Sequence, residues 1–237
     1  MFSCVAILLY LLCFLATPIQ SQPSDKVVAV YGSTPTLDGA IDVGEWDDAS
    51  IVIFSVTDGA NCTVYVKQDE VNLYVALNIS DNTYSVDDAC GIAFDVDHDG
   101  TVTLQADDVL FIITRNATIQ EFDVTIEDWN PTTISGWSAK AASTQSVWQA
   151  EYNITYSKLN IIAGMDNTLG VFFFTFDSVM TYNWPSTTGW FRPDTWGDMT
   201  SNGYNWEVPE LNVFYVFVIL FLVFPAFYYW IKPRRLA

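Results

Sequence analysis

The stretch Asn72-Leu73-Tyr74-Val75-Ala76-Leu77-Asn78-Ile79 alternates between two kinds of position. Its odd-numbered residues are leucine, valine, leucine and isoleucine, and its even-numbered residues are asparagine, tyrosine, alanine and asparagine. Successive side chains of a β-strand point to opposite faces of the sheet. This period of two therefore predicts a strand with one face in the core and the other facing outward.

The alternation continues on both sides of this stretch. It recurs at 90–96, 122–127 and 148–154. Residues 109–113 and 171–176 carry apolar side chains on both faces, as strands covered from two sides do. Gln68-Asp69-Glu70 separates two of the strands and predicts a hairpin turn. No helical stripe appears between the two ends of the chain, so the sequence predicts an all-β protein, an antiparallel β-sandwich of jelly-roll or immunoglobulin-like type.

The two ends of the chain carry apolar segments of a different kind. Val5–Ala16 has no charge and is too short to span a membrane, so residues 1–21 are predicted to be a signal peptide. Residues 211–231 also carry no charge, are long enough to span, and end in an aromatic belt. We therefore expect a transmembrane helix over 209–231.

The basic tail at 232–237 follows the apolar segment directly and is predicted to be cytoplasmic. Residues 22–208 then form an extracellular domain of a single-pass cell-membrane protein. The tail also resembles archaeal and bacterial sorting signals, with Val208-Pro209-Glu210-Leu211 before the span and Lys232-Pro233-Arg234-Arg235 after it. That resemblance leaves open whether the helix is retained or cut off and replaced by a lipid anchor.

The extracellular domain is strongly acidic. The whole chain has a net charge of −19, and residues 22–208 hold 27 acidic and six basic side chains. Nucleic acid is excluded as a partner, because phosphate binding needs a basic surface. Four Asn-x-Ser/Thr sequons predict glycosylation at Asn61, Asn78, Asn116 and Asn153. Cys62 and Cys90 are predicted to form a disulfide, with two buried free thiols as the alternative.

Asp95-Val96-Asp97-His98-Asp99-Gly100-Thr101 predicts a calcium loop. Alternate carboxylates followed by glycine can wrap a hard cation with oxygen ligands. The carbonyl of Thr101 could add a ligand, and Asp107 and Asp108 could close the site. Ala106 stands where an EF-hand has its glutamate, so the loop is expected between two strands. The alternative is a solvated acidic turn.

The segment Leu37-Asp38-Gly39-Ala40-Ile41-Asp42-Val43-Gly44-Glu45-Trp46-Asp47-Asp48-Ala49 resembles the opening of family 9 carbohydrate-binding modules and their DOMON-like relatives. Later pieces resemble the same family in the same order, at 64–67 with 72–76, 81–95, 148–159 and 196–197. The resemblance implies a β-sandwich that binds a polysaccharide or glycan without catalysis. Trp46 and Trp196 fall on its recurring motifs and are assigned to packing.

Loop aromatics are the candidates for sugar binding. Pro185 and Gly189 bracket a loop that could present Trp184 and Trp190 to a sugar, and Tyr84 is a candidate third wall. No catalytic set is visible, so we do not expect an enzyme. Two alternatives stay open: a structural or adhesive envelope protein without sugar binding, and a haem-binding redox domain. We expect no haem, because the one histidine, His98, lies in the acidic loop.

Overall fold

The computed structural model describes residues 25–56, 60–144, 146–177, 180–186 and 188–202. The predicted signal peptide, transmembrane helix and cytoplasmic tail lie outside these ranges, at 1–21, 209–231 and 232–237. In the part of the chain that is described, no helix combines the length and hydropathy that a membrane span requires.

The predicted hairpin around Asp69 is confirmed. β3 (Asn61–Gln68) and β4 (Asn72–Ser80) are antiparallel neighbours. The carboxylate of Asp69 closes their turn, because it accepts the backbone N–H groups of Val71 at 2.8 Å and Asn72 at 2.9 Å. These bonds occupy backbone donors that would otherwise need water as a partner.

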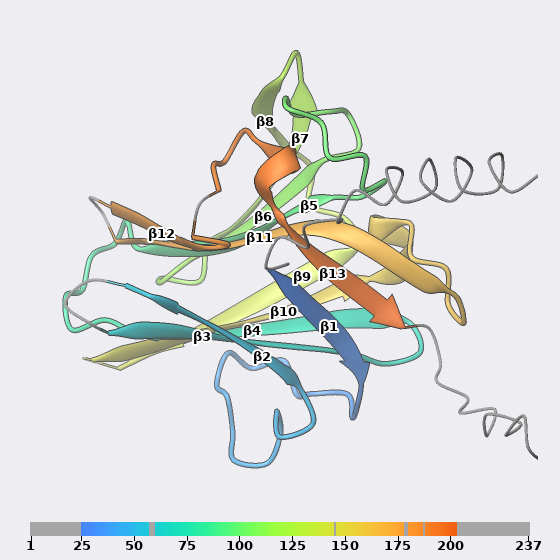
Figure 1. Cartoon of the computed structure of the whole chain (residues 1–237). Helices are drawn as coiled ribbons and strands as arrows, with labels where there is room; N and C mark the ends of the chain where they lie inside the picture. The colour runs from blue at the N-terminus through green and yellow to red at the C-terminus, as the bar shows by residue number, and fades with distance from the viewer. Residues whose placement is uncertain (1–24, 57–59, 145, 178–179, 187, 203–237) are drawn as a thin grey trace, which may run out of the picture.

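The described residues form 13 strands. Besides the hairpin, they are β1 (Lys26–Tyr31), β2 (Ser50–Ser55), β5 (Ala89–Asp95), β6 (Val109–Thr114), β7 (Ile119–Thr125), β8 (Asp128–Thr132), β9 (Trp137–Ser143), β10 (Val147–Thr155), β11 (Asp166–Asp177), β12 (Met180–Trp184) and β13 (Gly197–Asn202). Figure 1 shows two stacked layers, as the sequence predicts. The lower layer runs β2-β3-β4-β10-β9, and the upper layer runs β8-β7-β6-β5-β11, with β12 and β13 together along the far edge of β11.

Strand β1 departs from the antiparallel prediction. Its first part pairs with β13 in the upper layer, and its last residues, Val30 and Tyr31, pair with β3 in the lower layer. Both pairings are parallel. β1 therefore crosses between the layers and hydrogen-bonds their two edges together, which a short-range hydrophobic pattern cannot reveal.

Apolar side chains fill the space between the layers where the alternation predicts them. On β4 the buried inward residues are Leu73, Val75, Leu77 and Ile79. On β10 they are Trp148, Ala150, Tyr152 and Ile154. A second apolar cluster covers the outer face of the upper layer and includes Leu110, Phe172, Phe174 and Trp196. This cluster confirms that β6 and β11 are covered on both faces.

The strand expected over 122–127 ends earlier than its alternation predicts. β7 stops at Thr125, and Ile126 and Glu127 form a two-residue connection to β8. Both turn residues have positive φ values, 55° and 58°, as a type I′ hairpin requires. Ile126 is therefore exposed and does not extend the apolar face.

The predicted disulfide is absent. Cys62 and Cys90 are buried free thiols in the central apolar cluster, on β3 and β5 of opposite layers. The Sγ atom of Cys90 lies 3.4 Å from the Tyr152 hydroxyl. Burial raises the pKa of Cys90 to about 12, so the thiol stays protonated. Here both cysteines pack as small apolar side chains.

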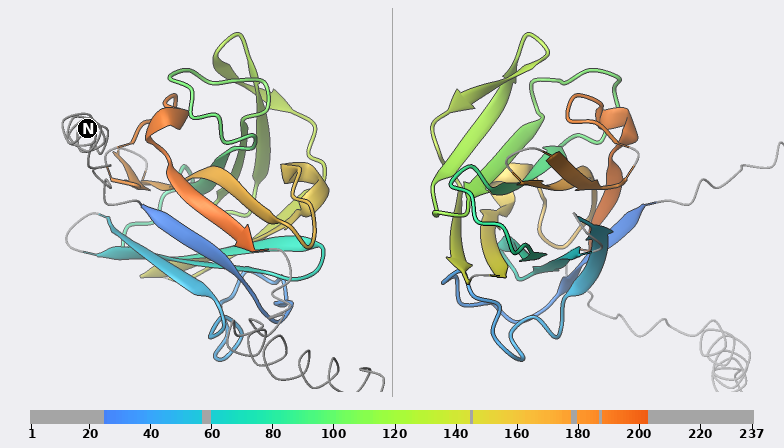
Figure 2. Two further views of the ribbon diagram at one scale, coloured as in Figure 1. Left: turned by 45° about the vertical axis from the view of Figure 1, so that its right-hand side comes forward. Right: turned by 90° about the vertical axis from the view of Figure 1, so that its left-hand side faces the viewer.

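Residues 32–49, which include the segment 37–49 that opens the family resemblance, cover the outer face of the lower layer (Figure 2). The Trp46 ring is only 3% exposed and packs on Tyr74 and Ala76, which confirms its assignment to packing. These two residues lie on the face of β4 expected to point outward, so the 32–49 segment turns an outer face into a small third core.

Glu151 on β10 holds this segment in place. Its carboxylate accepts hydrogen bonds from the backbone N–H of Asp38 at 3.1 Å, the backbone N–H of Gly39 at 2.8 Å and the indole N–H of Trp46 at 3.0 Å. Gly39 has φ of +95°, and a Cβ atom there would lie 2.6 Å from the carbonyl carbon of Ala141. Glycine is therefore required by both conformation and space.

Candidate functional site

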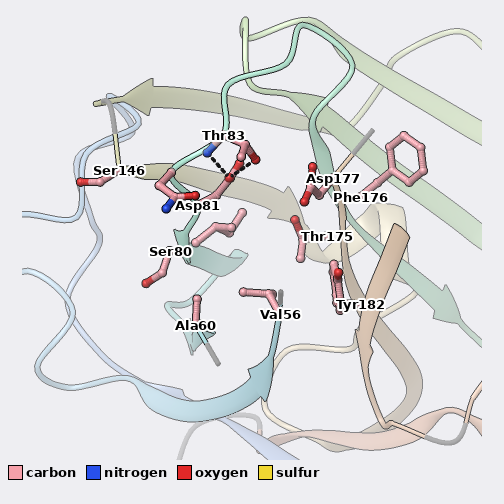
Figure 3. A pocket seen from close by; sticks show the side chains of 12 residues that line it. Val56, Ala60, Ser80, Asp81, Thr83, Ser146, Thr175, Phe176, Asp177 and Tyr182 are labelled. Carbon is pink, nitrogen blue, oxygen red and sulfur yellow. Dashed lines mark hydrogen bonds between the residues drawn. The ribbon is translucent and has the colours of Figure 1, made fainter. Parts of the chain in front are cut away.

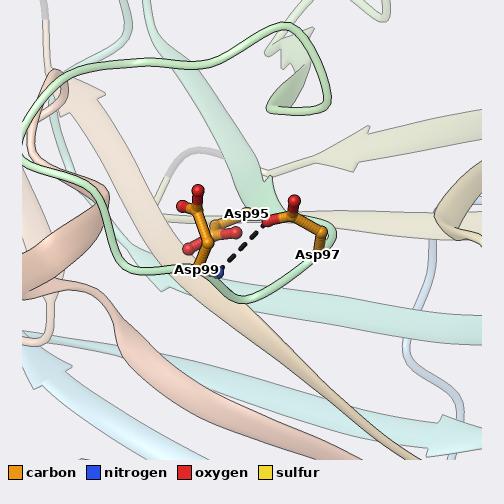
Figure 4. Close-up of side chains that lie close together, drawn as sticks. All are labelled: Asp95, Asp97 and Asp99. Carbon is orange, nitrogen blue, oxygen red and sulfur yellow. Dashed lines mark hydrogen bonds between the residues drawn. The ribbon is translucent and has the colours of Figure 1, made fainter.

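Five carboxylates meet where β5 ends and β6 begins. We call Asp95, Asp97, Asp99, Asp107 and Asp108 the carboxylate cluster. Carboxylate oxygens of Asp95, Asp97 and Asp99 lie within 4.8 Å of one another (Figure 4), and so do those of Asp95, Asp107 and Asp108. Asp95 belongs to both groups. The loop curls around it, because its Oδ2 atom accepts the backbone N–H of Gly100 at 3.0 Å.

The charge in this cluster lacks compensation within the described protein. Asp95 is 1% exposed, and its Oδ1 atom has no hydrogen-bond partner. Burial, more than the charges of Asp95 and Asp107, raises the pKa of Asp108 to about 7. Slight burial, with Asp107 and Asp99 nearby, also raises the pKa of Asp97. An unpartnered buried oxygen among repelling carboxylates fits a hard cation, which takes oxygen ligands.

Two residues of the acidic loop make other contacts. The Thr101 carbonyl accepts the backbone N–H of Asp194 at 2.9 Å, and its hydroxyl donates to the carbonyl of Thr103. The first bond joins the Thr101 carbonyl to the residues before β13, and the role of this carbonyl as a cation ligand stays a prediction. The Nε2 atom of His98 lies 3.1 Å from Asp198 Oδ1, so its ring also turns toward β13.

The structure separates the two tryptophans that the sequence placed in one sugar site. Trp184 packs against the central core, with its ring centroid 5.6 Å from that of Phe173. Trp190 packs on the outer face of the upper layer, 4.2 Å from the Phe174 ring centroid. Phe173 and Phe174 are neighbours in β11 and point to opposite faces. The two indoles therefore cannot form two walls of one cleft, and Trp184 serves the core.

Trp190 lines a hollow of about 640 Å³ on the outer face of the upper layer, which we call the outer groove. Its walls are Val86, Asp87, Ala89, Ile112, Thr114, Gln120, Phe174, Phe176, Thr181 and Trp190. A Cβ atom at Gly91 would lie 2.4 Å from the Phe174 ring. Because glycine has no Cβ, the Phe174 ring can pack directly on the sheet beneath Trp190. The groove thus combines aromatic faces with carboxylate, amide and hydroxyl groups.

A second hollow of about 270 Å³ opens at one end of the sandwich, and we call it the end pocket (Figure 3). It is lined by Val56, Ala60, Ile79, Ser80, Asp81, Asn82, Thr83, Ser146, Thr175, Phe176, Asp177 and Tyr182. The side chains come from both layers. Phe176 lines the end pocket and the outer groove alike.

A buried arginine organises the loop between the two hollows. The guanidinium of Arg115, at the end of β6, lies 2.8 Å from Asp81 and 3.1 Å from Asp88. It also donates to the carbonyls of Thr83 and Thr144. Tyr84 is exposed, and its ring centroid lies 5.0 Å from the guanidinium carbon. Tyr84 therefore stands on the arginine-held loop 81–88, whose residues line both hollows.

The fold has been seen before in sugar-binding proteins. A carbohydrate-binding module of family 9 from Caldicellulosiruptor kristjanssonii, in complex with cellotriose, matches 77% of this chain and 96% of its own, with a TM-score of 0.62 and 21% identity. Its complex with glucose gives the same TM-score and identity over 98% of that chain. The chain shares its fold with family 9 carbohydrate-binding modules.

More distant matches agree with this fold. A putative carbohydrate-binding protein from Bacteroides uniformis ATCC 8492 aligns with 74% of this chain and 97% of its own, with a TM-score of 0.51 and 11% identity. No known family profile matches the sequence, and no curated protein sequence matches it significantly.

The four sequons differ in accessibility on this carbohydrate-binding-module fold. Asn61 and Asn116 are exposed, at the start of β3 and in the turn after β6. Asn78 and Asn153 are partly buried within β4 and β10. Asn78 Oδ1 accepts a hydrogen bond from the Gln149 amide at 3.3 Å. The two exposed asparagines are therefore the more accessible acceptors for a glycan.

Sequence reasoning missed several residues that shape the two hollows. The apolar pattern of 171–176 places Phe176 only in a covered strand, and Gln120 and Thr181 carry no signal that a local pattern can detect. Arg115 does carry a signal, because an isolated arginine at the end of an apolar strand indicates a buried ion pair. Its role depends on Asp81 and Asp88, which the chain brings close only in three dimensions.

Proposed function

We propose that residues 22–208 form a non-catalytic carbohydrate-binding module whose sugar site is the outer groove. The observation that carries the proposal is the Trp190 ring, supported on Phe174 and beside Phe176 in a groove that also holds polar side chains. It is supported by the shared fold with modules whose structures contain cellotriose and glucose.

Binding would use the two kinds of group that line the groove. The apolar face of a pyranose can stack on the Trp190 indole, while its hydroxyls bond to Asp87, Gln120 and Thr114. Asp87 and Gln120 are exposed and can adapt to the sugar. With one main stacking ring, we expect a dissociation constant near the millimolar range, a binding free energy of about −4 kcal/mol.

Replacing Trp190 by alanine tests this site. We expect the affinity for cellotriose, measured by isothermal titration calorimetry, to fall by about tenfold or more, because the pyranose loses its stacking surface; a tenfold change corresponds to about 1.4 kcal/mol. Phe191→Ala is the matched control, since Phe191 is the adjacent exposed aromatic residue and does not line the groove. Its binding should equal that of the wild type.

Circular dichroism would check that the Trp190 variant stays folded. Should it unfold, Gln120→Ala replaces it, because Gln120 is exposed and lines the same groove. Unchanged sugar affinity in both groove variants would contradict the site. Failure of the wild type to bind any glycan would favour a structural or adhesive role instead.

We further propose that calcium stabilises the module by binding the carboxylate cluster. Asp95 would be central, because it belongs to both carboxylate groups and has the unpartnered buried oxygen. Asp97 and Asp99 would bind from the loop, and Asp107 and Asp108 from the residues before β6. The cation would supply the positive charge that links these segments; it would take no part in a reaction. Thr101 is not needed for this assignment.

We also propose that the module lies outside the cell, anchored by a transmembrane helix over 209–231. The support is the apolar run, its basic end and the sequons, two of which are exposed on the fold. Added protease should digest residues 22–208 on intact cells and spare the basic tail. Immunoblotting with separate tags on the two sides reads this out, and protection of the module until the cells are lysed would contradict the topology.

A further inference from the structure

Three large apolar side chains are exposed at the end of the sandwich where β13, the last described strand, ends. Val71, Ile162 and Met165 are 60%, 58% and 56% exposed. Val71 lies in the β3–β4 turn, and Ile162 and Met165 lie in the loop before β11. Figure 1 shows this turn, the start of β11 and the end of β13 on one side of the molecule. We call the surface formed by these three side chains the exit surface.

The last residues of β13 are joined to both segments that carry the exit surface. Asn202 pairs with Asp166, the residue that follows Met165. The hydroxyl of Ser201 donates a hydrogen bond to the side chain of Gln68, which ends β3 directly before the turn. The described chain therefore ends beside the exit surface.

The loop before β11 is held by a side chain that follows it. Asn167 accepts the backbone N–H of Ile162 at 3.2 Å and donates to the carbonyls of Ile162 at 3.1 Å and Met165 at 2.8 Å. Residues 162–165 are all exposed, and none of them is charged. Folding thus fixes the backbone of this loop and still leaves two large apolar side chains in water. Grouped exposure of this kind marks a surface that meets an apolar partner.

The position of the proposed membrane anchor indicates which partner this is. The transmembrane helix is expected to begin at residue 209, so only residues 203–208 connect it to Asn202. A fully extended chain covers at most about 3.3–3.6 Å per residue, so the anchor would hold Asn202 within roughly 25 Å of the bilayer. Resting on the proposed membrane anchor, we propose that the exit surface docks on the bilayer and that Val71, Ile162 and Met165 enter its headgroup region. The short connection makes this contact intramolecular, so a weak apolar contact is enough.

The charge of the module favours uncharged lipid headgroups as the docking partner. Val71 and residues 162–165 offer no basic side chain to an anionic headgroup. Residues 22–208 hold 27 acidic and six basic side chains, so an anionic lipid surface would repel the module as a whole. The contact is therefore apolar, with a membrane surface of zwitterionic lipids.

Docking through the exit surface leaves the outer groove accessible. The exit surface adjoins the first residue of β11, whereas Phe174 and Phe176 of the groove lie near its last residue. The two exposed sequons, Asn61 and Asn116, also lie at the far end, at the start of β3 and in the turn after β6. The groove would therefore face away from the membrane, and glycans on these two asparagines would not separate the exit surface from the lipid.

Fluorescence quenching in the full chain, reconstituted into phosphatidylcholine vesicles, tests the contact. A nitrobenzoxadiazole probe is attached to Met165→Cys. Met180→Cys is the matched control, because Met180 is 55% exposed and pairs with Asp177 at the other end of β11. We expect lipids with a nitroxide near the headgroup to remove about half or more of the emission at position 165, since interfacial apolar groups sit roughly 5–10 Å into this boundary. Emission at position 180 should stay nearly unchanged. Cys62 and Cys90 are buried, and the unsubstituted chain measures background labelling.

Two changes should weaken the contact. Ile162→Asp places a carboxylate on the exit surface and should reduce quenching at position 165 to the level of position 180, because a charge resists transfer into lipid. Replacing part of the phosphatidylcholine by phosphatidylglycerol should also reduce quenching, because the acidic module is repelled. Stronger quenching in phosphatidylglycerol would contradict docking on a neutral surface.

Flotation of the same vesicles separates the two ways in which the proposal can fail. A chain that does not float with the vesicles would overturn the membrane anchor and the docking contact together. A chain that floats, yet shows equal quenching at positions 165 and 180, would overturn the docking contact alone. The anchor and the proposed glycan-binding function would then stand.

Discussion

Replacing Trp46 by alanine is expected to destabilise the module by about 3–5 kcal/mol, the usual cost of removing a buried tryptophan. For a domain of this size the melting temperature should then fall by roughly 6–20 °C. The ring is 3% exposed, and its centroid lies 6.2 Å from that of Tyr65. Lys67 Nζ lies 4.9 Å above the Trp46 ring centroid, a cation–π contact that the variant also loses.

Polar groups left without partners add to this loss. The Trp46 indole donates to Glu151, and the Lys67 ammonium, fully buried, bonds to the Glu45 carbonyl and to Asp48 in the same segment. If the 32–49 segment no longer packs on the sheet, the buried charges of Lys67 and Glu151 lose hydrogen-bond partners. An uncompensated buried charge destabilises the folded state. Thermal or urea unfolding measures the change.

Two further variants separate packing from a general effect of mutation. Trp46→Phe keeps part of the apolar contact and loses the hydrogen bond to Glu151. Its free energy of unfolding should therefore lie between those of the wild type and Trp46→Ala. Val43→Ala changes a fully exposed side chain of the same segment and should shift stability by less than about 0.5 kcal/mol. Equal stability of Trp46→Ala and Val43→Ala would show that the 32–49 segment does not form a core.

The sequence predicts this fold well where the pattern is local. The alternation of 72–79 and 148–154 depends only on which face meets the core, and both stretches are strands with the expected inward residues. The acidic loop is also local, since Asp95, Asp97 and Asp99 lie within five residues. Asp107 and Asp108 join them because β5 and β6 are antiparallel neighbours, with Phe94 opposite Val109.

Prediction fails where the outcome depends on distant segments. Glu151 occupies an outward position of its strand and looks like a solvated residue, yet it is buried because residues 32–49 fold over it. Trp184 and Trp190 share one glycine- and proline-containing stretch, but sequence spacing does not show which face of β11 each ring meets. The parallel pairing of β1 with both layers is non-local for the same reason.

Removing calcium is expected to lower the melting temperature of the wild-type module by roughly 5–11 °C. A ligand that binds only the folded state adds about 2.7 kcal/mol at a hundredfold excess over its dissociation constant, and about 1 kcal/mol corresponds to 2–4 °C for a domain of this size. Differential scanning calorimetry with a chelator and with excess calcium measures the difference. We expect this effect because bound calcium would compensate the charges of the carboxylates gathered around Asp95.

Asp97→Ala should abolish the response to calcium. Asp97 is exposed, so its removal leaves no cavity, and it relieves repulsion from Asp99 and Asp107. In chelator the variant should therefore melt at or above the temperature of the wild type, whereas in calcium it should melt below it. Asp166→Ala, which removes an exposed carboxylate far along the chain from the cluster, should keep the full response. A wild-type melting temperature that chelator and excess calcium both leave unchanged would reduce the carboxylate cluster to a solvated acidic turn.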